Sequence, residues 1–188
     1  MRISCFGSSK DSPSELYDEM KVAGKLLALR GVGIATGALG GIGMLAAPEG
    51  AAAVGGTPIA GYTYGGNPPN RYVNEVVDCR RLAKGIPFDA EYCIRLAGLL
   101  SSDAFIIVGG GGAGTFLELI AAINFNQKFW KPMKRIAILE TRGDALGTWN
   151  DSVLAALRTW GVLSEEVAAS IRAVNSADKA VRCACDGT

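Results

Sequence analysis

The residues with the clearest chemical potential lie in the segment Val108–Glu118, where five glycines are followed by a threonine and a glutamate. The apolar stretch Ala104–Val108 predicts a buried strand, and the residues after the glycines predict a helix. A glycine loop that opens a helix leaves backbone N–H groups unpaired, and such groups bind phosphate. Glu118 lies one turn inside that helix, beside the predicted phosphate. This pairing of a carboxylate with a phosphate cradle indicates chemistry on a nucleotide.

A second glycine-rich segment, Gly37–Gly43, follows the apolar run Val32–Ala35 and precedes a predicted short helix. In open parallel sheets, ligands bind beyond the carboxyl ends of the strands, where the strand order reverses. Both glycine loops follow strands and precede helices. We therefore expect them to share one crevice.

Short apolar runs alternate with helical patterns along the whole chain. Strands are expected at Arg2–Phe6, Val32–Ala35, Thr57–Tyr62, Ala104–Val108, Arg135–Leu139 and, at an edge, Arg172–Val174, with Tyr72–Val77 ambiguous. Helices are expected at Pro13–Leu29, Met44–Val54, Asp89–Leu100, Thr115–Gln127 and Thr148–Trp160, with two more capped by Ser164 and Ser176. This alternation predicts a single α/β domain over residues 1–188: doubly wound, Rossmann-like and three-layered, with a mainly parallel sheet.

Composition excludes several classes of function. The chain has 188 residues, of which 49% are apolar, and 19 Lys and Arg against 18 Asp and Glu. Without a basic stripe, binding to nucleic acid is not expected. No apolar leader follows Met1, so the cytoplasm is the default location. Residues 31–70 carry one charge, Glu49, but their many glycines and prolines argue against a membrane span.

The five cysteines are scattered, so they are expected to be reduced thiols. Cys183 and Cys185 are spaced like a metal ligand pair. However, the chain has no histidine and no second cysteine pair at zinc spacing. We therefore expect neither a metal site nor a bound cofactor.

Three segments together resemble one protein family. Gly110–Glu118 is similar to a PGGxGTxxE motif, Cys5–Ser9 to a CGSS segment after a first strand, and Thr36–Met44 to a GGGxxGLMG segment. These motifs are typical of the Lonely Guy (LOG) phosphoribohydrolases, once labelled possible lysine decarboxylases. They are shared by a sister group that includes a molybdenum-cofactor carrier protein. The resemblance extends from residue 3 to about residue 140.

The resemblance implies hydrolysis of the N-glycosidic bond of a nucleoside 5′-monophosphate to free base and ribose 5-phosphate. It assigns the catalytic pair to Glu118 and Arg95. The family's methionine and lysine around that arginine are Tyr92 and Leu96 here, and the proline of its glycine motif is Gly110. The predicted phosphate and nucleotide contacts are Gly7, Ser8, Gly37, Gly40, Gly41, Gly111, Gly112, Ala113, Gly114 and Thr115.

The residues leave other functions open. A noncatalytic carrier of a phosphorylated cofactor, such as the molybdenum cofactor, would use the same cradle without turnover. Gly109-x-Gly111-x-x-Gly114 also matches a dinucleotide fingerprint, with Glu140 as the acid that would bind ribose. The glycines could also be packing turns without a ligand. The decarboxylase label fits poorly, because a pyridoxal enzyme needs a lysine in its site and none lies near either glycine loop.

The predicted helices Asp89–Leu100 and Thr115–Gln127 carry apolar residues on more than one side. A helix of this kind must bury a second face, and in a small domain the sheet covers only one. We therefore expect a homodimer, or a higher homo-oligomer, whose interface lies close to the crevice. The residues concerned are Ile94, Leu96, Leu99, Leu100, Phe116, Leu117, Leu119, Ile120, Ile123 and Phe125.

Overall fold

The computed structural model describes residues 1–8, 15–86, 90–140 and 149–188. Its centre is one sheet of seven strands in the order β4-β3-β2-β1-β5-β6-β7. Every neighbouring pair is parallel, so the predicted mainly parallel sheet is confirmed and is in fact wholly parallel. The strands are β1 (Arg2–Phe6), β2 (Gly33–Thr36), β3 (Ile59–Thr63), β4 (Glu75–Asp78), β5 (Ala104–Val108), β6 (Arg135–Leu139) and β7 (Ile171–Val174).

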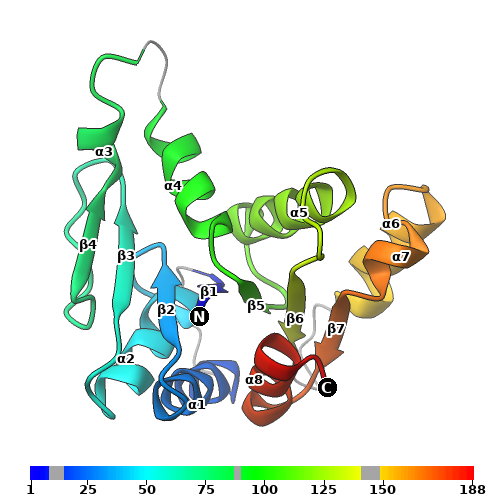
Figure 1. Cartoon of the computed structure of the whole chain (residues 1–188), viewed down its shortest axis with the longest axis horizontal. Helices are drawn as coiled ribbons and strands as arrows, with labels where there is room; N and C mark the ends of the chain where they lie inside the picture. The colour runs from blue at the N-terminus through cyan, green and yellow to red at the C-terminus, as the bar shows by residue number, and fades with distance from the viewer. Residues whose placement is uncertain (9–14, 87–89, 141–148) are drawn as a thin grey trace.

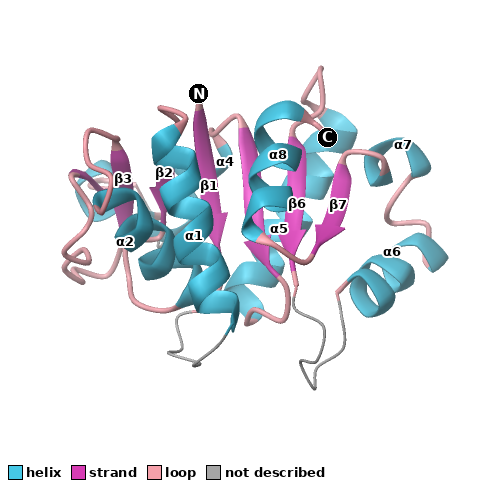
Figure 2. Cartoon of the chain, turned by 90° about the horizontal axis from the view of Figure 1, so that it is seen from below, coloured by secondary structure: helices cyan, strands magenta, loops and turns pink. Residues whose placement is uncertain are grey.

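Helices cover both faces of this sheet, which gives the predicted three-layer α/β fold (Figure 1). One face packs against α1 (Glu15–Leu29), η1 (Ile42–Ala46), α2 (Ala47–Ala52) and α8 (Ala177–Asp186). The other packs against α3 (Cys79–Leu82), α4 (Glu91–Leu100), α5 (Ala113–Lys128), η2 (Asn150–Leu154), α6 (Ala155–Thr159) and α7 (Glu165–Ala168). Figure 2 looks onto the face covered by α1, α2 and α8.

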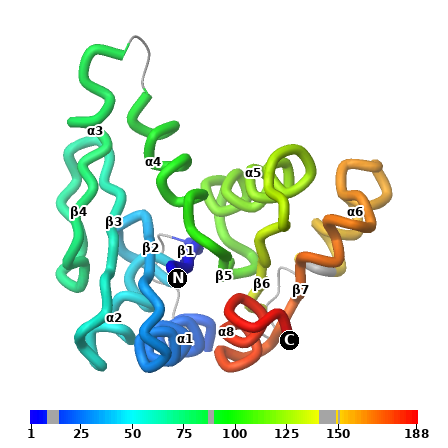
Figure 3. Tube along the Cα trace, viewed as in Figure 1, coloured from blue at the N-terminus to red at the C-terminus, as the bar shows by residue number. Residues whose placement is uncertain are grey.

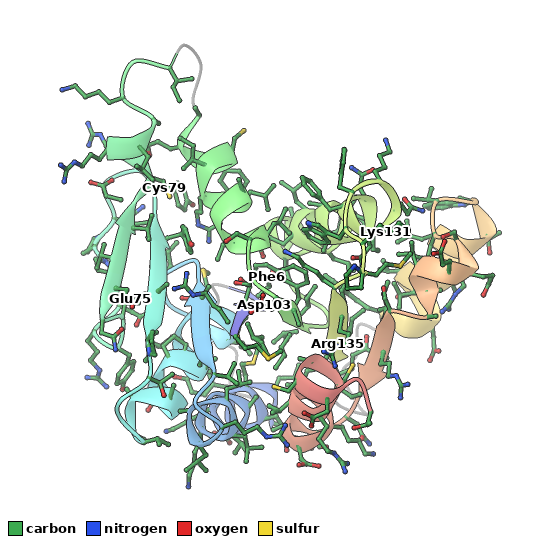
Figure 4. All side chains as sticks on the ribbon, viewed as in Figure 1. Phe6, Glu75, Cys79, Asp103, Lys131 and Arg135 are labelled. Atoms are coloured by element: carbon green, nitrogen blue, oxygen red, sulfur yellow. The ribbon has the colours of Figure 1, made fainter. Side chains whose placement is uncertain are left out.

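Successive side chains of β5 point to opposite faces of the sheet, so this strand packs against both helical layers. Ile106 packs into the core formed with α1 and α8, whereas Phe105 and Ile107 pack into the core formed with α4 and α5. All five residues of β5 are buried. A strand buried on both faces is a continuous apolar run, which is the pattern that identified it in the sequence. Phe6 lies on the α4 and α5 side of β1, near the middle of the molecule (Figure 4).

The structure corrects several element boundaries. β2 begins one residue later than predicted, at Gly33, and β3 begins at Ile59 rather than Thr57. The ambiguous segment forms the short edge strand β4. The helix predicted at Met44 begins instead at Ile42 with a π-helical turn. Gly43 explains this early start, because a Cβ there would overlap the backbone of Phe6 and Gly7 and so only glycine lets the turn approach β1.

Other boundaries shift at the helix ends. α4 begins at Glu91 rather than Asp89, and α5 begins at Ala113, two residues before the predicted start. Pro13 and Thr148, the predicted starts of two helices, lie outside the described residues. The caps Ser164 and Ser176 are confirmed, because each side chain accepts a hydrogen bond from a backbone N–H in the first turn.

The topology creates one switch point, between β1 and β5. These neighbours lie at the centre of the sheet, and α1 after β1 covers one face while α5 after β5 covers the other. Figure 3 shows α1 and α5 on opposite sides of these strands. The carboxyl ends of β1 and β5 therefore border the crevice where ligands bind in such sheets.

In the part of the chain that the structure describes, no helix combines the length and the apolar character that crossing a bilayer requires.

All five cysteines lie among the described residues, and all are free thiols, as predicted from their scattered positions.

Candidate functional site

A cavity of about 240 Å³ lies at the switch point. Its walls come from the ends of β1 and β5, from the loops after β2 and β3, from η1, and from the facing sides of α4 and α5. The two glycine loops therefore meet at one site, as the sequence predicted. The residues that line it are Gly7, Ser8, Leu39, Met44, Tyr64, Tyr92, Arg95, Gly112, Ala113, Gly114, Thr115 and Glu118.

A buried ion pair joins the two helices at this cavity. Arg95 of α4 and Glu118 of α5 approach to 3.5 Å between Nη1 and Oε1. Each residue is only 5% exposed. Charged side chains are almost never buried this deeply unless they are paired. The structure therefore brings the two predicted catalytic residues together, although 23 positions separate them in the chain.

The surroundings of Glu118 change its acidity. Burial raises the pKa of the Glu118 carboxyl from 4.5 to about 7, and the charge of Arg95 opposes part of that shift. Desolvation dominates because it disfavours the charged form, while Arg95 is an ion-pair partner at 3.5 Å rather than a close hydrogen-bond donor. A carboxyl with a pKa near 7 exchanges a proton readily at neutral pH, as a general base requires.

The Arg95 guanidinium is held by contacts on all sides. Nε donates to the backbone oxygen of Tyr62 at 3.3 Å, and Nη2 contacts the sulfur of Met44 at 3.5 Å. The rings of Tyr64 and Tyr92 lie 5.3 Å and 5.7 Å from Cζ, within cation–π range. With Glu118 at Nη1, each of the three guanidinium nitrogens has a protein partner. The side chain is therefore fixed in orientation before any ligand arrives.

Gly37 makes room for this guanidinium. A Cβ built on Gly37 would overlap Nη2 of Arg95 and would lie 2.6 Å from the Met44 sulfur. Gly37 directly follows β2, so the absence of a side chain there lets Arg95 reach the end of the sheet. This glycine acts on the site through Arg95.

The N-terminus of α5 faces the cavity without a side-chain cap. Gly112 is the N-cap residue, and no side chain caps this end of the helix. The preceding Gly110 has φ of 72°, a conformation that favours glycine. Ala113, Gly114 and Thr115 form the first turn, whose N–H groups have no acceptor within the helix. This end can accept an anion.

Of the ten predicted phosphate contacts, six line the cavity and four do not. Gly37 packs against Arg95, as described above. Gly111 packs against the side chain of Thr115, and Gly40 is exposed with open space where a Cβ would be. Gly41 has φ of 89° and precedes the π-helical turn, so its role is conformational. The six that line the cavity are Gly7, Ser8, Gly112, Ala113, Gly114 and Thr115.

Four cavity residues were not among the predicted site residues: Leu39, Met44, Tyr64 and Tyr92. Leu39 and Met44 reach the cavity because Asn70 holds their loop, donating from Nδ2 to the backbone oxygens of both residues and of Ala38. The available signal for Tyr92 was its position three residues before Arg95, which places both side chains on one side of the predicted helix. Nothing local in the sequence indicated that Asn70 organises the second glycine loop.

Comparison with protein families identifies the chain. Residues 1–139 match the model of the SLOG cluster4 family. The chain belongs to this family. The matched range contains both glycine loops, Arg95 and Glu118, and so spans every cavity residue. Among curated proteins, no sequence matches this SLOG protein.

Solved structures share the fold of this SLOG protein. The X-ray structure of TM1055 has a TM-score of 0.70, with 22% identity over 96% of each chain. A molybdenum cofactor binding protein from Rippkaea orientalis has a TM-score of 0.63, with 19% identity over 96% of this chain and 93% of that one. The molybdenum cofactor carrier protein from Chlamydomonas reinhardtii has a TM-score of 0.62, with 18% identity over 97% and 94%. Together with the family match, they confirm the predicted relationship to the LOG and carrier group.

Proposed function

We propose that this SLOG protein hydrolyses the N-glycosidic bond of a nucleoside 5′-monophosphate, releasing the free base and ribose 5-phosphate. The observation that carries the proposal is the buried pair of Arg95 and Glu118 beside the uncapped N-terminus of α5. The helix end suits a phosphate, and the carboxylate lies one turn away from it. A ribosyl group anchored by its phosphate would therefore present its anomeric carbon near Glu118.

The residue types fit this reaction. Cleavage of a ribosyl bond passes through a state with oxocarbenium character, which a nearby carboxylate stabilises. In its ionised form Glu118 also orients the attacking water and accepts a proton from it. Arg95 stays protonated at neutral pH, so it cannot act as a general acid. Its role is to position the carboxylate and to favour its ionised form against the cost of burial.

The size of the cavity supports a compact ligand inside it. At about 240 Å³ it is smaller than the roughly 300–1,000 Å³ of ordinary ligand pockets. A phosphoribosyl group fits this space better than a whole dinucleotide. The base would then extend toward Leu39 of the second glycine loop and toward Tyr64, whose loop matches no recognised motif.

The first prediction concerns the reaction itself. The purified protein is expected to release free base from at least one nucleoside 5′-monophosphate, and not from the matching nucleoside. The reason is that the helix end contributes binding only when the phosphate is present. Chromatography of the common monophosphates after incubation measures this directly. If no base were released from any of them, the hydrolase proposal would be abandoned in favour of a binding function.

The second candidate function is carriage of a phosphorylated cofactor without turnover. Two of the solved structures with this fold are described as molybdenum cofactor binding or carrier proteins. The uncapped helix end would serve a carrier equally well. A carrier, however, has no use for a buried carboxylate whose pKa lies near neutral pH. Mass spectrometry of the ligand that copurifies with the protein separates the two: a nucleoside monophosphate supports the hydrolase, and a pterin supports the carrier.

The dinucleotide alternative receives less support. Its ribose-binding acid would be Glu140, which directly follows β6. Glu140 is buried, and its carboxylate accepts a hydrogen bond from the backbone N–H of Trp149. The same side chain packs where a Cβ on Gly109 would lie. Glu140 therefore serves the protein's own packing.

The exposed apolar residues of the helices still favour a homodimer, but fewer residues are exposed than the sequence predicted. Leu99, Leu100, Leu119 and Ile123 are buried against the chain's own sheet. The exposed apolar residues lie on α5, spread around its outward side. They are Phe116, Leu117 and Phe125, which are 41%, 43% and 36% exposed.

A partner's equivalent helices would cover this patch in a two-fold arrangement. Light scattering on the purified protein is expected to report a mass of about twice 19.6 kDa or more. Replacing Leu117 with aspartate should shift the population toward monomer, because a charge would be buried in the interface. A wild-type protein that remained monomeric at micromolar concentration would contradict the prediction.

A further inference from the structure

Among the described residues that line the cavity, few side chains could hold a phosphate beside the helix end. Arg95 is the only cationic side chain among the described residues that line it. Its guanidinium nitrogens already contact Tyr62, Met44 and Glu118. Three of the five guanidinium N–H groups are thus engaged by the protein's own groups, and the positive charge is shared with Glu118. Hydroxyl and backbone N–H groups of the described lining residues are the other donors available to a phosphate.

Tyr92 is a hydroxyl residue that faces the end of α5 from the opposite side of the cavity. Its hydroxyl accepts a hydrogen bond from the Arg95 side chain, which leaves the hydroxyl's own proton to be donated elsewhere. Tyr92 lies near the start of α4, and its ring packs edge-on against Tyr64 with centroids 5.9 Å apart. Both rings line the cavity. A Cβ built on Gly114 would lie 3.5 Å from the Tyr92 hydroxyl oxygen and would have no other neighbour within 4 Å. The hydroxyl thus reaches across from α4 to the first turn of α5.

We propose that Tyr92 selects phosphate-bearing ligands by donating a hydrogen bond from its hydroxyl to a phosphate seated at the N-terminus of α5. This inference rests on the proposed ligand class, a nucleoside 5′-monophosphate. It assigns to Tyr92 a contact that a methionine or a phenylalanine at this place could not make, because neither side chain has a hydroxyl to donate.

The electrostatics agree with a donor role. Burial and the charge of Glu118 raise the pKa of the Tyr92 hydroxyl, although Arg95 acts in the opposite direction. The phenol therefore keeps its proton throughout the neutral range, which a donor to an anion requires. The edge-on contact with Tyr64 fixes the plane of the ring, so little conformational freedom is lost when the hydrogen bond forms.

The test removes only the hydroxyl. In Tyr92→Phe, calorimetry is expected to show weaker binding of adenosine 5′-monophosphate and of ribose 5-phosphate by about 10- to 100-fold, the range for a hydrogen bond to a charged group. Binding of adenosine, which has no phosphate, should not change. Tyr72→Phe is the matched control, because it removes a hydroxyl that contacts Arg71 away from the cavity.

The outcomes are separable. If Tyr92→Phe weakened the binding of adenosine and of adenosine 5′-monophosphate by the same factor, Tyr92 would have a packing role and the inference would be overturned. Unchanged affinities in Tyr92→Phe, with tight wild-type binding, would overturn it while leaving the proposed function intact. Wild-type protein that bound neither ribose 5-phosphate nor any of the common nucleoside 5′-monophosphates would overturn both. Thermal unfolding of each variant checks that the fold persists.

Discussion

Replacing Glu118 with glutamine is expected to lower the rate of base release by about 10²-fold or more while ligand binding persists or tightens. Glutamine keeps the size of the side chain but carries no charge, so it can neither stabilise a cationic transition state nor accept a proton from water. Binding should survive because the phosphate contacts lie at the end of α5. The measurement compares kcat and the dissociation constant of the nucleotide between Glu118→Gln and the unaltered protein.

Glu49→Gln provides the matched control for this variant. Glu49 is also ion-paired, with Lys21 at 2.9 Å, and it accepts a hydrogen bond from Tyr17. It lies in α2, which covers the opposite face of the sheet from α4 and α5. Turnover should be retained in Glu49→Gln. Unchanged turnover in Glu118→Gln would rule out the mechanism proposed here.

The same carboxyl predicts the pH dependence. Its pKa of about 7 means that the ionised, active form increases as pH rises through neutrality, so kcat should rise with pH.

The free energy of unfolding should change with pH in the opposite direction. Because the folded pKa lies above the ordinary value of 4.5, the contribution of Glu118 is fully present below that value and is lost as pH rises through about 7. Both trends should be absent from Glu118→Gln, as paired kinetic and thermal unfolding series would show.

Replacing Gly37 with alanine is expected to reduce turnover by about 10- to 100-fold, because the new methyl group occupies the space of Arg95 Nη2. The guanidinium must move away from Glu118, and a displacement of about 1 Å is enough to cost on the order of 10²-fold in rate. The loss should appear in kcat, since Gly37 itself does not line the cavity. Steady-state kinetics measure the effect.

Gly33→Ala separates this effect from simple strain in β2. Gly33 is the first residue of the same strand, and a Cβ there would make only ordinary contacts, the nearest with the Pro58 oxygen at 3.5 Å. Its turnover should stay near that of the unaltered protein. If Gly37→Ala remained as active as Gly33→Ala, the position of Arg95 would not matter for the reaction.

Much of the fold was predictable because its signals are local. The strands Arg2–Phe6, Ala104–Val108 and Arg135–Leu139 were predicted to the residue, since each contains a short apolar run that stops at a glycine or a charged residue. The helix around Glu118 follows directly from the glycine loop before it. Boundaries failed where tertiary contacts intervene, as at Ile42, whose early helical turn depends on the close approach of Gly43 to Gly7.

The candidate site divides in the same way. The sequence by itself determined that a glycine loop after a buried strand opens a helix with Glu118 one turn inside, because hydrogen bonding and periodicity within about fifteen residues decide this. Only the tertiary structure decided that Arg95 is held between Tyr62, Met44 and Glu118, and that Tyr92 reaches Gly114. These contacts join residues from different strands, loops and helices, whose meeting depends on how the helices pack across the sheet rather than on any local pattern.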